Sequence, residues 1–180
     1  MLFKIYDRSP EYPRDKAFYG SVTVQNGERV EPFYKYAKDT PLVRSWAGSV
    51  LEQVAAGMQR SYGQPCNHVV VNQYQSGADY IGAHHDKPAT FHPGSSVLTV
   101  SLGGERTLRL TCVKGPDTGK QHDVRLPHGS LFVLGPETNK DWKHEILKDK
   151  KAEHRRISLT YRRIDAVRRT KIYRVDLTQA

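Results

Sequence analysis

The chain has 180 residues, of which 37% are hydrophobic and 26% are charged. This length predicts one domain with a core of its own, and the composition excludes a disordered or a membrane-spanning chain. No apolar run approaches the ~20 residues of a transmembrane helix. The first residues mix acidic and basic side chains and lack the apolar core of a signal peptide. We therefore expect a monomeric, intracellular protein that does not bind membranes.

The net charge of +9 arises from 28 Lys and Arg against 19 Asp and Glu, and nearly half of the basic residues lie between Lys140 and Arg174. Such an excess favours an anionic partner, nucleic acid first, although a basic surface can also serve solubility alone. Cys66 and Cys112 have no CxxC partner, which excludes a cysteine zinc site. They are typical of buried thiols in a reducing compartment.

Residues 1–40 are broken by Pro and Gly and predict loops with short extended pieces. From Val43 to Met58 the apolar residues recur at the three- and four-residue spacing of an amphipathic helix. Gly63 is suited to end that helix as a C-cap. We therefore expect one long helix that begins near residue 43 and ends near Gly63.

Beyond Gly63, short β-branched runs alternate with turn residues, and nothing else is typical of a helix. The expected strands are 68–74, 97–102, 107–113, 124–126, 130–134, 145–147, 156–164 and 171–175. Many short strands after one helix predict a mainly β protein with a flanking helix, an α+β fold built as a double-stranded β-helix (jelly-roll) barrel. No helices separate the strands, which argues against a parallel α/β sheet.

The segment IGAHHDK, residues 81–87, carries the most informative chemistry. Alternate side chains of an extended segment share a face, so His84 and Asp86 point one way and His85 the other. Two histidines and one carboxylate form the facial triad of non-haem Fe(II) oxygenases. A lone His-x-Asp is frequent by chance, however, and also fits a solvated polar loop. A third ligand must come from elsewhere in the chain.

His144 is the favoured third ligand, because it lies in the short segment WKHEI, 12 residues before an arginine-bearing strand. Other histidines lie in turns rich in Pro and Gly or in a charged run. The alternatives are His92, His122, His128 and His154.

The strand 156–162 places a polar row on one face by its period of two: Arg156, Ser158, Thr160 and Arg162. An outer sheet face can hold two arginines. A barrel interior with this row would suit a small dicarboxylate instead, because guanidinium groups pair with carboxylates bidentately. Asn72 and Tyr74 share a face of an earlier strand and could hydrogen-bond the same anion, although an ordinary edge strand fits them too.

Together these residues resemble the AlkB family of Fe(II)- and 2-oxoglutarate-dependent dioxygenases, over roughly residues 13–164. The resemblance is carried by Asn72-x-Tyr74, His84-x-Asp86, His144, and Arg156 with Arg162. Four longer segments are similar to family segments in the same order: NQYQSGADYIGAHHDK, SSVLTVSLGGERTLRL, PHGSLFVL and RRISLTYRRI. Further upstream, this sequence also resembles the nucleotide-recognition region of the family members that demethylate nucleic acids. The residues that carry this likeness are Pro13-Arg14, Tyr19-Gly20, Tyr34-Lys-Tyr36 and Trp46.

The resemblance implies oxidative demethylation of N-alkylated bases in DNA or RNA, which consumes O2 and 2-oxoglutarate and releases formaldehyde, succinate and CO2. It implies that Fe(II) is held by His84, Asp86 and His144. The 2-oxoglutarate contacts would be Asn72, Tyr74, Arg156, Thr160 and Arg162, and the substrate contacts Tyr34, Tyr36, Trp46 and Lys87. Trp46 also fits the apolar stripe of the expected helix, which would place it in the core.

The same resemblance divides a single domain, residues 1–180, into three parts. These are a nucleotide-recognition region with a support helix (1–62), the jelly-roll core (63–164) and a basic C-terminal tail (165–180). Two residues depart from the family pattern. Lys87 stands where repair members often carry an acidic residue, and Ser158 stands where Asn is frequent. The resemblance therefore does not determine the base selectivity, because of Lys87, or one hydrogen bond to the co-substrate, because of Ser158.

Three other functions compete with this one. The same iron chemistry could hydroxylate or demethylate a protein, a lipid or a small molecule, and such an enzyme would show no salt-dependent binding to nucleic acid. A non-catalytic binding module is disfavoured, because it would need neither the metal set nor the arginines. Zinc hydrolysis through the same three ligands leaves the paired arginines unexplained.

Overall fold

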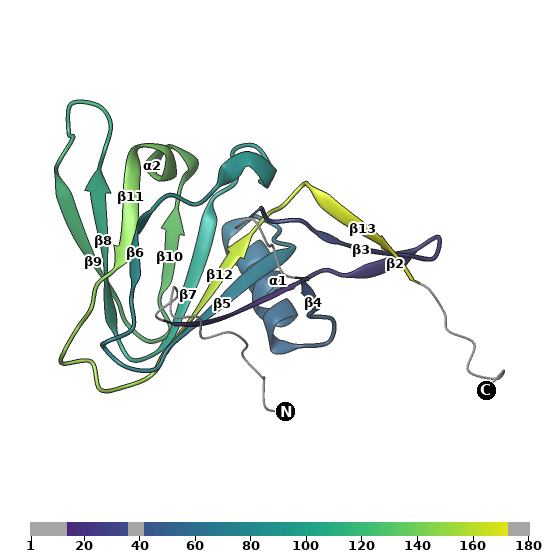
Figure 1. The fold of residues 1–180 in the computed structure, drawn as a ribbon, viewed down its shortest axis with the longest axis horizontal. Helices are drawn as coiled ribbons and strands as arrows, with labels where there is room; N and C mark the ends of the chain where they lie inside the picture. Colours follow the sequence, from purple (N-terminus) through teal and green to yellow (C-terminus); the bar gives the residue numbers. More distant parts are fainter. Residues whose placement is uncertain (1–13, 36–41, 173–180) are drawn as a thin grey trace.

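The computed structural model describes residues 14–35 and 42–172, which form three sheets and a long helix (Figure 1). The large sheet is ordered β10 (Leu131–Leu134), β7 (Val97–Gly103), β12 (Arg156–Arg162), β5 (His68–Tyr74), β1 (Asp15–Gly20) and β4 (Arg44–Ser45). The small sheet is ordered β6 (Ile81–His84), β11 (Trp142–Ile146), β8 (Arg106–Cys112) and β9 (Gln121–Leu126). The third sheet is ordered β13 (Val167–Lys171), β3 (Glu28–Pro32) and β2 (Thr23–Gln25).

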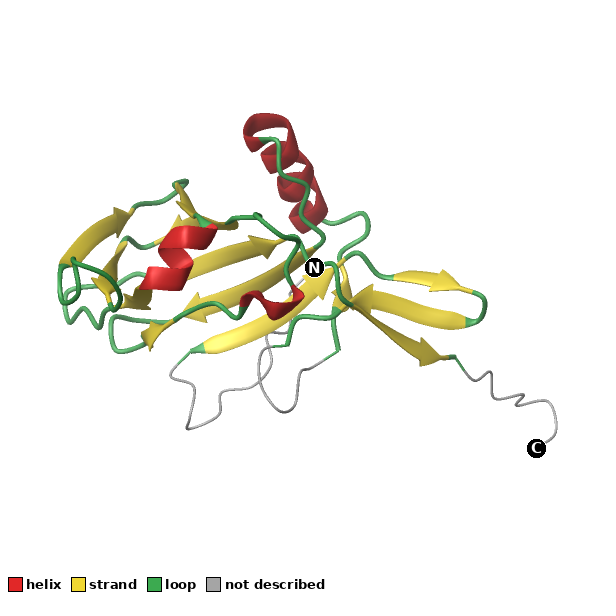
Figure 2. Ribbon diagram, turned by 90° about the horizontal axis from the view of Figure 1, so that it is seen from above, coloured by secondary structure: helices red, strands yellow, loops and turns green. Residues whose placement is uncertain are grey.

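The large and small sheets line a common cavity, and the helix α1 (Val50–Tyr62) lies on the other side of the large sheet (Figure 2). Alternation along β5 produces the two faces: Val69 and Val71 pack toward the helix, whereas Val70 and Asn72 line the cavity. The Tyr161 hydroxyl anchors the helix by donating to the Leu51 carbonyl at 2.9 Å. This arrangement confirms the predicted mainly β fold with a flanking helix.

The helix begins later than predicted, at Val50. Gly48 has a φ of 71°, a left-handed conformation that stops helical geometry from extending to Val43. Glu52 in the first turn accepts a hydrogen bond from the Gly48 N–H at 2.8 Å, which stabilises the start. The predicted end is confirmed, because Gly63 is the C-cap with a φ of 80°.

Several elements were not expected from the sequence. β1 and β3 form where loops were predicted, and a second helix, α2 (Pro136–Asp141), forms where only a turn was expected. A short 3-10 helix, η1 (Pro88–Thr90), follows β6. Six residues of helix show too little periodicity to be found in a sequence, whereas the start of α2 at Pro136 is a common N1 position.

The third sheet projects at the right of Figure 1 and contains part of the predicted basic tail, since β13 pairs with β3. Its best-buried charge is Glu31, which is 1% exposed and accepts hydrogen bonds from Arg29 and Arg168. The pair with Arg168 neutralises part of the positive charge of β13. Within residues 14–35 and 42–172, no helix has the length and apolarity needed to cross a membrane.

Candidate metal centre and anion cavity

The cavity is lined by an apolar wall on one side and by a row of polar side chains on the other. Small-sheet residues such as Leu108, Leu126 and Ile146 form its apolar wall. The polar row comes from β12 and β5, with Arg156, Ser158, Thr160 and Arg162 beside Asn72 and Tyr74. The inward face predicted for strand 156–162 is therefore the face that the structure shows.

His84, Asp86 and His144 meet at this cavity, with one potential ligand atom from each within 4.8 Å of the others. His84 ends β6 and lies opposite His144 of β11 in the ladder, which brings the two ring centroids to 4.2 Å. Asp86 follows two residues later, beyond the end of the strand. Among the described residues, this is the one group of three His, Cys, Asp or Glu side chains placed to hold a metal.

Both imidazoles are held in the neutral form that binds metal. The Nδ1–H of His84 donates to the Gly82 carbonyl at 2.8 Å, which leaves Nε2 free as a ligand. Nδ1 of His144 is buried and has no hydrogen-bond partner in the described part of the chain. Burial lowers the pKa of His144 to about 4 and also lowers the pKa of His84.

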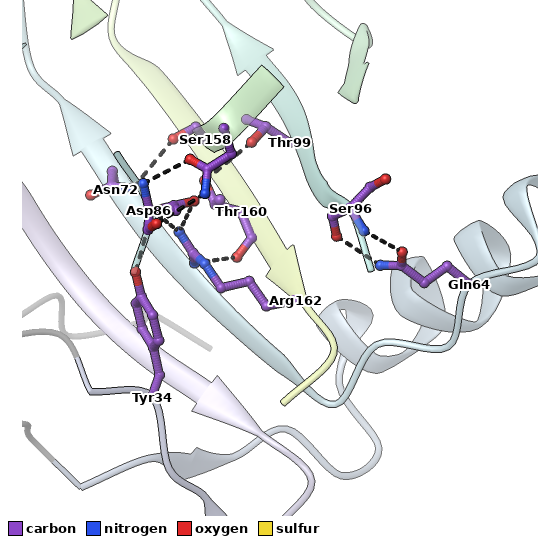
Figure 3. A network of polar contacts seen from close by, with 10 residues as sticks. Tyr34, Gln64, Asn72, Asp86, Ser96, Thr99, Ser158, Thr160 and Arg162 are labelled. Carbon is purple, nitrogen blue, oxygen red and sulfur yellow. Dashed lines mark hydrogen bonds and ion pairs between the residues drawn. The ribbon is translucent and has the colours of Figure 1, made fainter. Parts of the chain in front are cut away.

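Asp86 supplies the negative charge of the centre. Burial has the largest single effect and would by itself raise the pKa of Asp86, but the combined attraction of Arg162, His144 and His84 lowers it. Nη2 of Arg162 donates to both carboxylate oxygens at 2.8 Å, and the Tyr34 hydroxyl donates to Oδ1 at 3.3 Å (Figure 3). Two neutral imidazoles and one carboxylate fit a divalent transition metal such as Fe(II) with open coordination positions.

Arg156 makes the end of the cavity away from the metal ligands cationic. It is 1% exposed, and its guanidinium lies 5.1 Å from the centre of the Tyr74 ring. Nη2 donates to the Ser101 hydroxyl at 2.9 Å, but Nε and Nη1 have no acceptor among the described residues. Burial lowers the pKa of Arg156, and the neighbouring Tyr74 opposes that shift. A buried cation with unused donors fits a carboxylate ligand.

Asn72 and Thr160 line the cavity between these two ends. The Oδ1 atom of Asn72 accepts from Nε of Arg14 at 2.9 Å, and the hydroxyls of Thr99 and Thr160 lie 3.4 Å apart. Arg14, which the sequence associates only with the nucleotide-recognition region, is 3% exposed and lines the cavity. Its partner is 58 residues away in the chain, so no local pattern could reveal the contact.

The predicted substrate contacts are only partly brought together. Tyr34 is 2% exposed, and its ring stacks under Arg162, with the guanidinium carbon 4.6 Å from the ring centroid. Lys87 is exposed and directly follows Asp86. Trp46 packs with Tyr161 in the core beneath α1, on the sheet face opposite the cavity, so the structure does not bring it to the site. Tyr36 lies outside the described residues.

Comparisons with known proteins agree with this geometry. The family model of the 2OG-Fe(II) oxygenase superfamily matches residues 8–162. The chain is 31% identical over 166 residues to DNA oxidative demethylase ALKBH2 of Mus musculus, which covers 89% of this chain and 66% of that protein. It is 23% identical over 158 residues to alpha-ketoglutarate-dependent dioxygenase alkB homolog 3 of Rattus norvegicus, covering 84% of this chain and 50% of the relative.

A solved structure of OsALKBH1 superposes with a TM-score of 0.51 at 17% identity, covering 81% of this chain and 85% of that one. This likeness shows the fold alone and agrees with the predicted jelly roll. The chain spans about two thirds or less of the two curated relatives named above. A jelly roll with a His-Asp-His centre beside a cationic cavity defines a class of mononuclear metal oxygenases. The chain belongs to the 2OG-Fe(II) oxygenase superfamily and, within it, to the AlkB family.

Proposed function

We propose that the protein is an Fe(II)- and 2-oxoglutarate-dependent dioxygenase that demethylates N-alkylated bases in DNA or RNA. One observation carries the proposal: a triad suited to Fe(II) and a buried arginine with free donors share one cavity. The similarity to proteins named as a DNA oxidative demethylase and an alpha-ketoglutarate-dependent dioxygenase supports the reaction class. The products would be formaldehyde, succinate, CO2 and the unmodified base.

In this proposal, His84, Asp86 and His144 hold Fe(II), which supplies the activation of O2 and the oxidation of the N-methyl carbon. Arg156 receives the far carboxylate of 2-oxoglutarate, and Tyr74 lies beside that pair. Asn72 and Thr160 orient the chain of the co-substrate from the same cavity wall. Arg162 belongs to the metal end, because its guanidinium already contacts Asp86.

The protein's own residues would also keep water away from the reacting atoms. Asp86, Arg156 and Arg162 are each at most 4% exposed, and the wall opposite them is apolar. A water-poor cavity strengthens the pairing between guanidinium and carboxylate groups. Because the reacting atoms are enclosed in this way, the target nucleotide must be single-stranded or flipped out of a duplex before its methyl group can reach the cavity.

On the substrate side, Tyr34 connects base recognition to the metal centre through its hydrogen bond to Asp86. Lys87 is exposed beside that ligand and can approach a base or a phosphate, and we propose Tyr36 as a further contact. Phosphate binding would fall to the basic residues between Lys140 and Arg174 other than Arg156 and Arg162, which line the cavity. We also propose that the protein is a monomer. A reducing intracellular compartment is supported by the two free cysteines.

The proposal is tested by incubating the protein with Fe(II), 2-oxoglutarate and oligonucleotides that carry 1-methyladenine or 3-methylcytosine, both single- and double-stranded. Mass spectrometry should show the loss of the methyl group, together with formaldehyde release. Replacement of Fe(II) by Zn(II) should abolish the reaction, because zinc has no redox chemistry. A fully metallated protein that demethylates none of these oligonucleotides would refute the nucleic-acid proposal.

A further inference from the structure

Asn139 of α2 contacts the metal centre through the backbone of Asp86. The side chain of Asn139 is buried, with the residue 5% exposed. The Asp86 N–H donates to Oδ1 of Asn139 at 2.9 Å, and Nδ2 of Asn139 donates to the Asp86 carbonyl at 2.9 Å. A side-chain amide carries the same donor and acceptor as a peptide group. The pair of bonds therefore imitates one hydrogen-bonded pair of an antiparallel ladder.

The bonds replace a ladder that stops at the metal site. His84 is opposite His144, so a continued antiparallel ladder would place Asp86 opposite Trp142. β6 ends at His84 instead, and the Asn139 amide satisfies the peptide groups that the missing pair leaves open. Asp86 is 4% exposed, so an unsatisfied N–H or carbonyl there would be costly.

The same contact joins the two segments that supply the ligands. Trp142 is both the C-cap of α2 and the first residue of β11, so Asn139 lies on a continuous unit with His144, five residues further on. The Asn139 N–H donates to the Gly135 carbonyl at 2.9 Å, which fixes the residue within the helix. One short unit thus carries His144 and holds the backbone of Asp86.

We propose that Asn139 is a positioning residue of the metal centre, which sets the place of the Asp86 carboxylate relative to the two imidazoles. This inference rests on the assignment of His84, Asp86 and His144 as metal ligands. Asn139 acts through Asp86 and touches no ligand atom of the triad. Loss of a partner that orients a metal ligand typically weakens metal binding about 10- to 100-fold.

The first test measures the affinity of the metal-free protein for Mn(II) and Co(II) in the absence of 2-oxoglutarate. Asn139→Ala should weaken binding about 10- to 100-fold. Thr138→Ala, on the same helix, should stay within about twofold of the wild type, because among the described residues no side-chain hydrogen bond joins Thr138 to Asp86. Thermal unfolding of both metal-free variants separates a loss of positioning from a loss of stability. A folded Asn139→Ala protein that binds both metals like the wild type would overturn the inference.

A second measurement does not depend on that variant being folded. Hydrogen exchange of the wild-type, metal-free protein should show a protected Asp86 amide, because this buried N–H donates to Oδ1 of Asn139. Exchange of the wild-type amide at the rate of an open chain would refute the contact. A wild-type protein that binds no divalent metal would instead refute the proposed function, so the two failures can be told apart.

Discussion

Replacing Arg156 by methionine separates ligand binding from folding. In the metal-free protein the substitution removes one hydrogen bond to Ser101 and a buried charge with two unused donors. The lost hydrogen bond costs about 1 kcal/mol, whereas an apolar side chain of similar volume in place of a poorly paired buried ion is often neutral or stabilising. We therefore expect Arg156→Met to unfold within about 1 kcal/mol of the wild type.

The effect on 2-oxoglutarate should be far larger. Removing one partner of a buried, hydrogen-bonded charge pair costs about 2–5 kcal/mol. At about 1.4 kcal/mol per tenfold, the affinity should fall between about 30-fold and a few thousand-fold. The affinity for Mn(II) alone should not change, because Arg156 contacts none of the three ligands. Isothermal titration of 2-oxoglutarate into the Mn(II)-loaded protein measures the difference directly.

Arg106 provides the matched control. It is also 1% exposed, but its Nη atoms donate to the backbone carbonyls of Ser76, Asp79 and Leu147. Arg106→Met leaves these carbonyls without their donor and should lower the free energy of unfolding by about 2–4 kcal/mol. The reasoning is wrong if Arg156→Met binds 2-oxoglutarate like the wild type, or if its unfolding resembles that of Arg106→Met.

Two further predictions concern histidines. His144→Ala should abolish metal binding and demethylation, whereas His154→Ala, an exposed histidine, should retain both in the same titration and oligonucleotide assay; the reverse result would show that the third ligand is misassigned. His68 is fully buried, neither of its ring nitrogens has a hydrogen-bond partner among the described residues, and burial lowers its pKa from 6.5 to about 3. As pH falls through this window, the unfolded chain binds a proton that the folded protein excludes, so stability declines by up to about 1.4 kcal/mol per pH unit. His68→Phe cannot bind this proton, so its free energy of unfolding relative to the wild type should rise by about 2.5 kcal/mol between pH 7 and pH 4.5. Urea unfolding of both proteins at the two pH values measures this change, and an equal difference between them at both values would contradict the assignment.

Local geometry made much of the site predictable. The backbone alternation of an extended segment places Arg156 and Arg162 on one face whatever surrounds them, and it does the same for Asn72 and Tyr74. The end of the helix at Gly63 was equally accessible, because glycine tolerates the left-handed conformation found there. Charge was less informative, since Arg156 and Arg162 are inside the cavity and Arg29 and Arg168 are paired with Glu31.

The sequence by itself therefore determined which residues share a strand face, because that follows from the covalent backbone. Only the tertiary structure decided which faces meet. It brought Arg162 to Asp86 across 76 positions and Asn139 to the same residue across 53, and it placed Trp46 on the far side of the sheet. Such contacts depend on how sheets and helices pack, and no short window of residues contains that information.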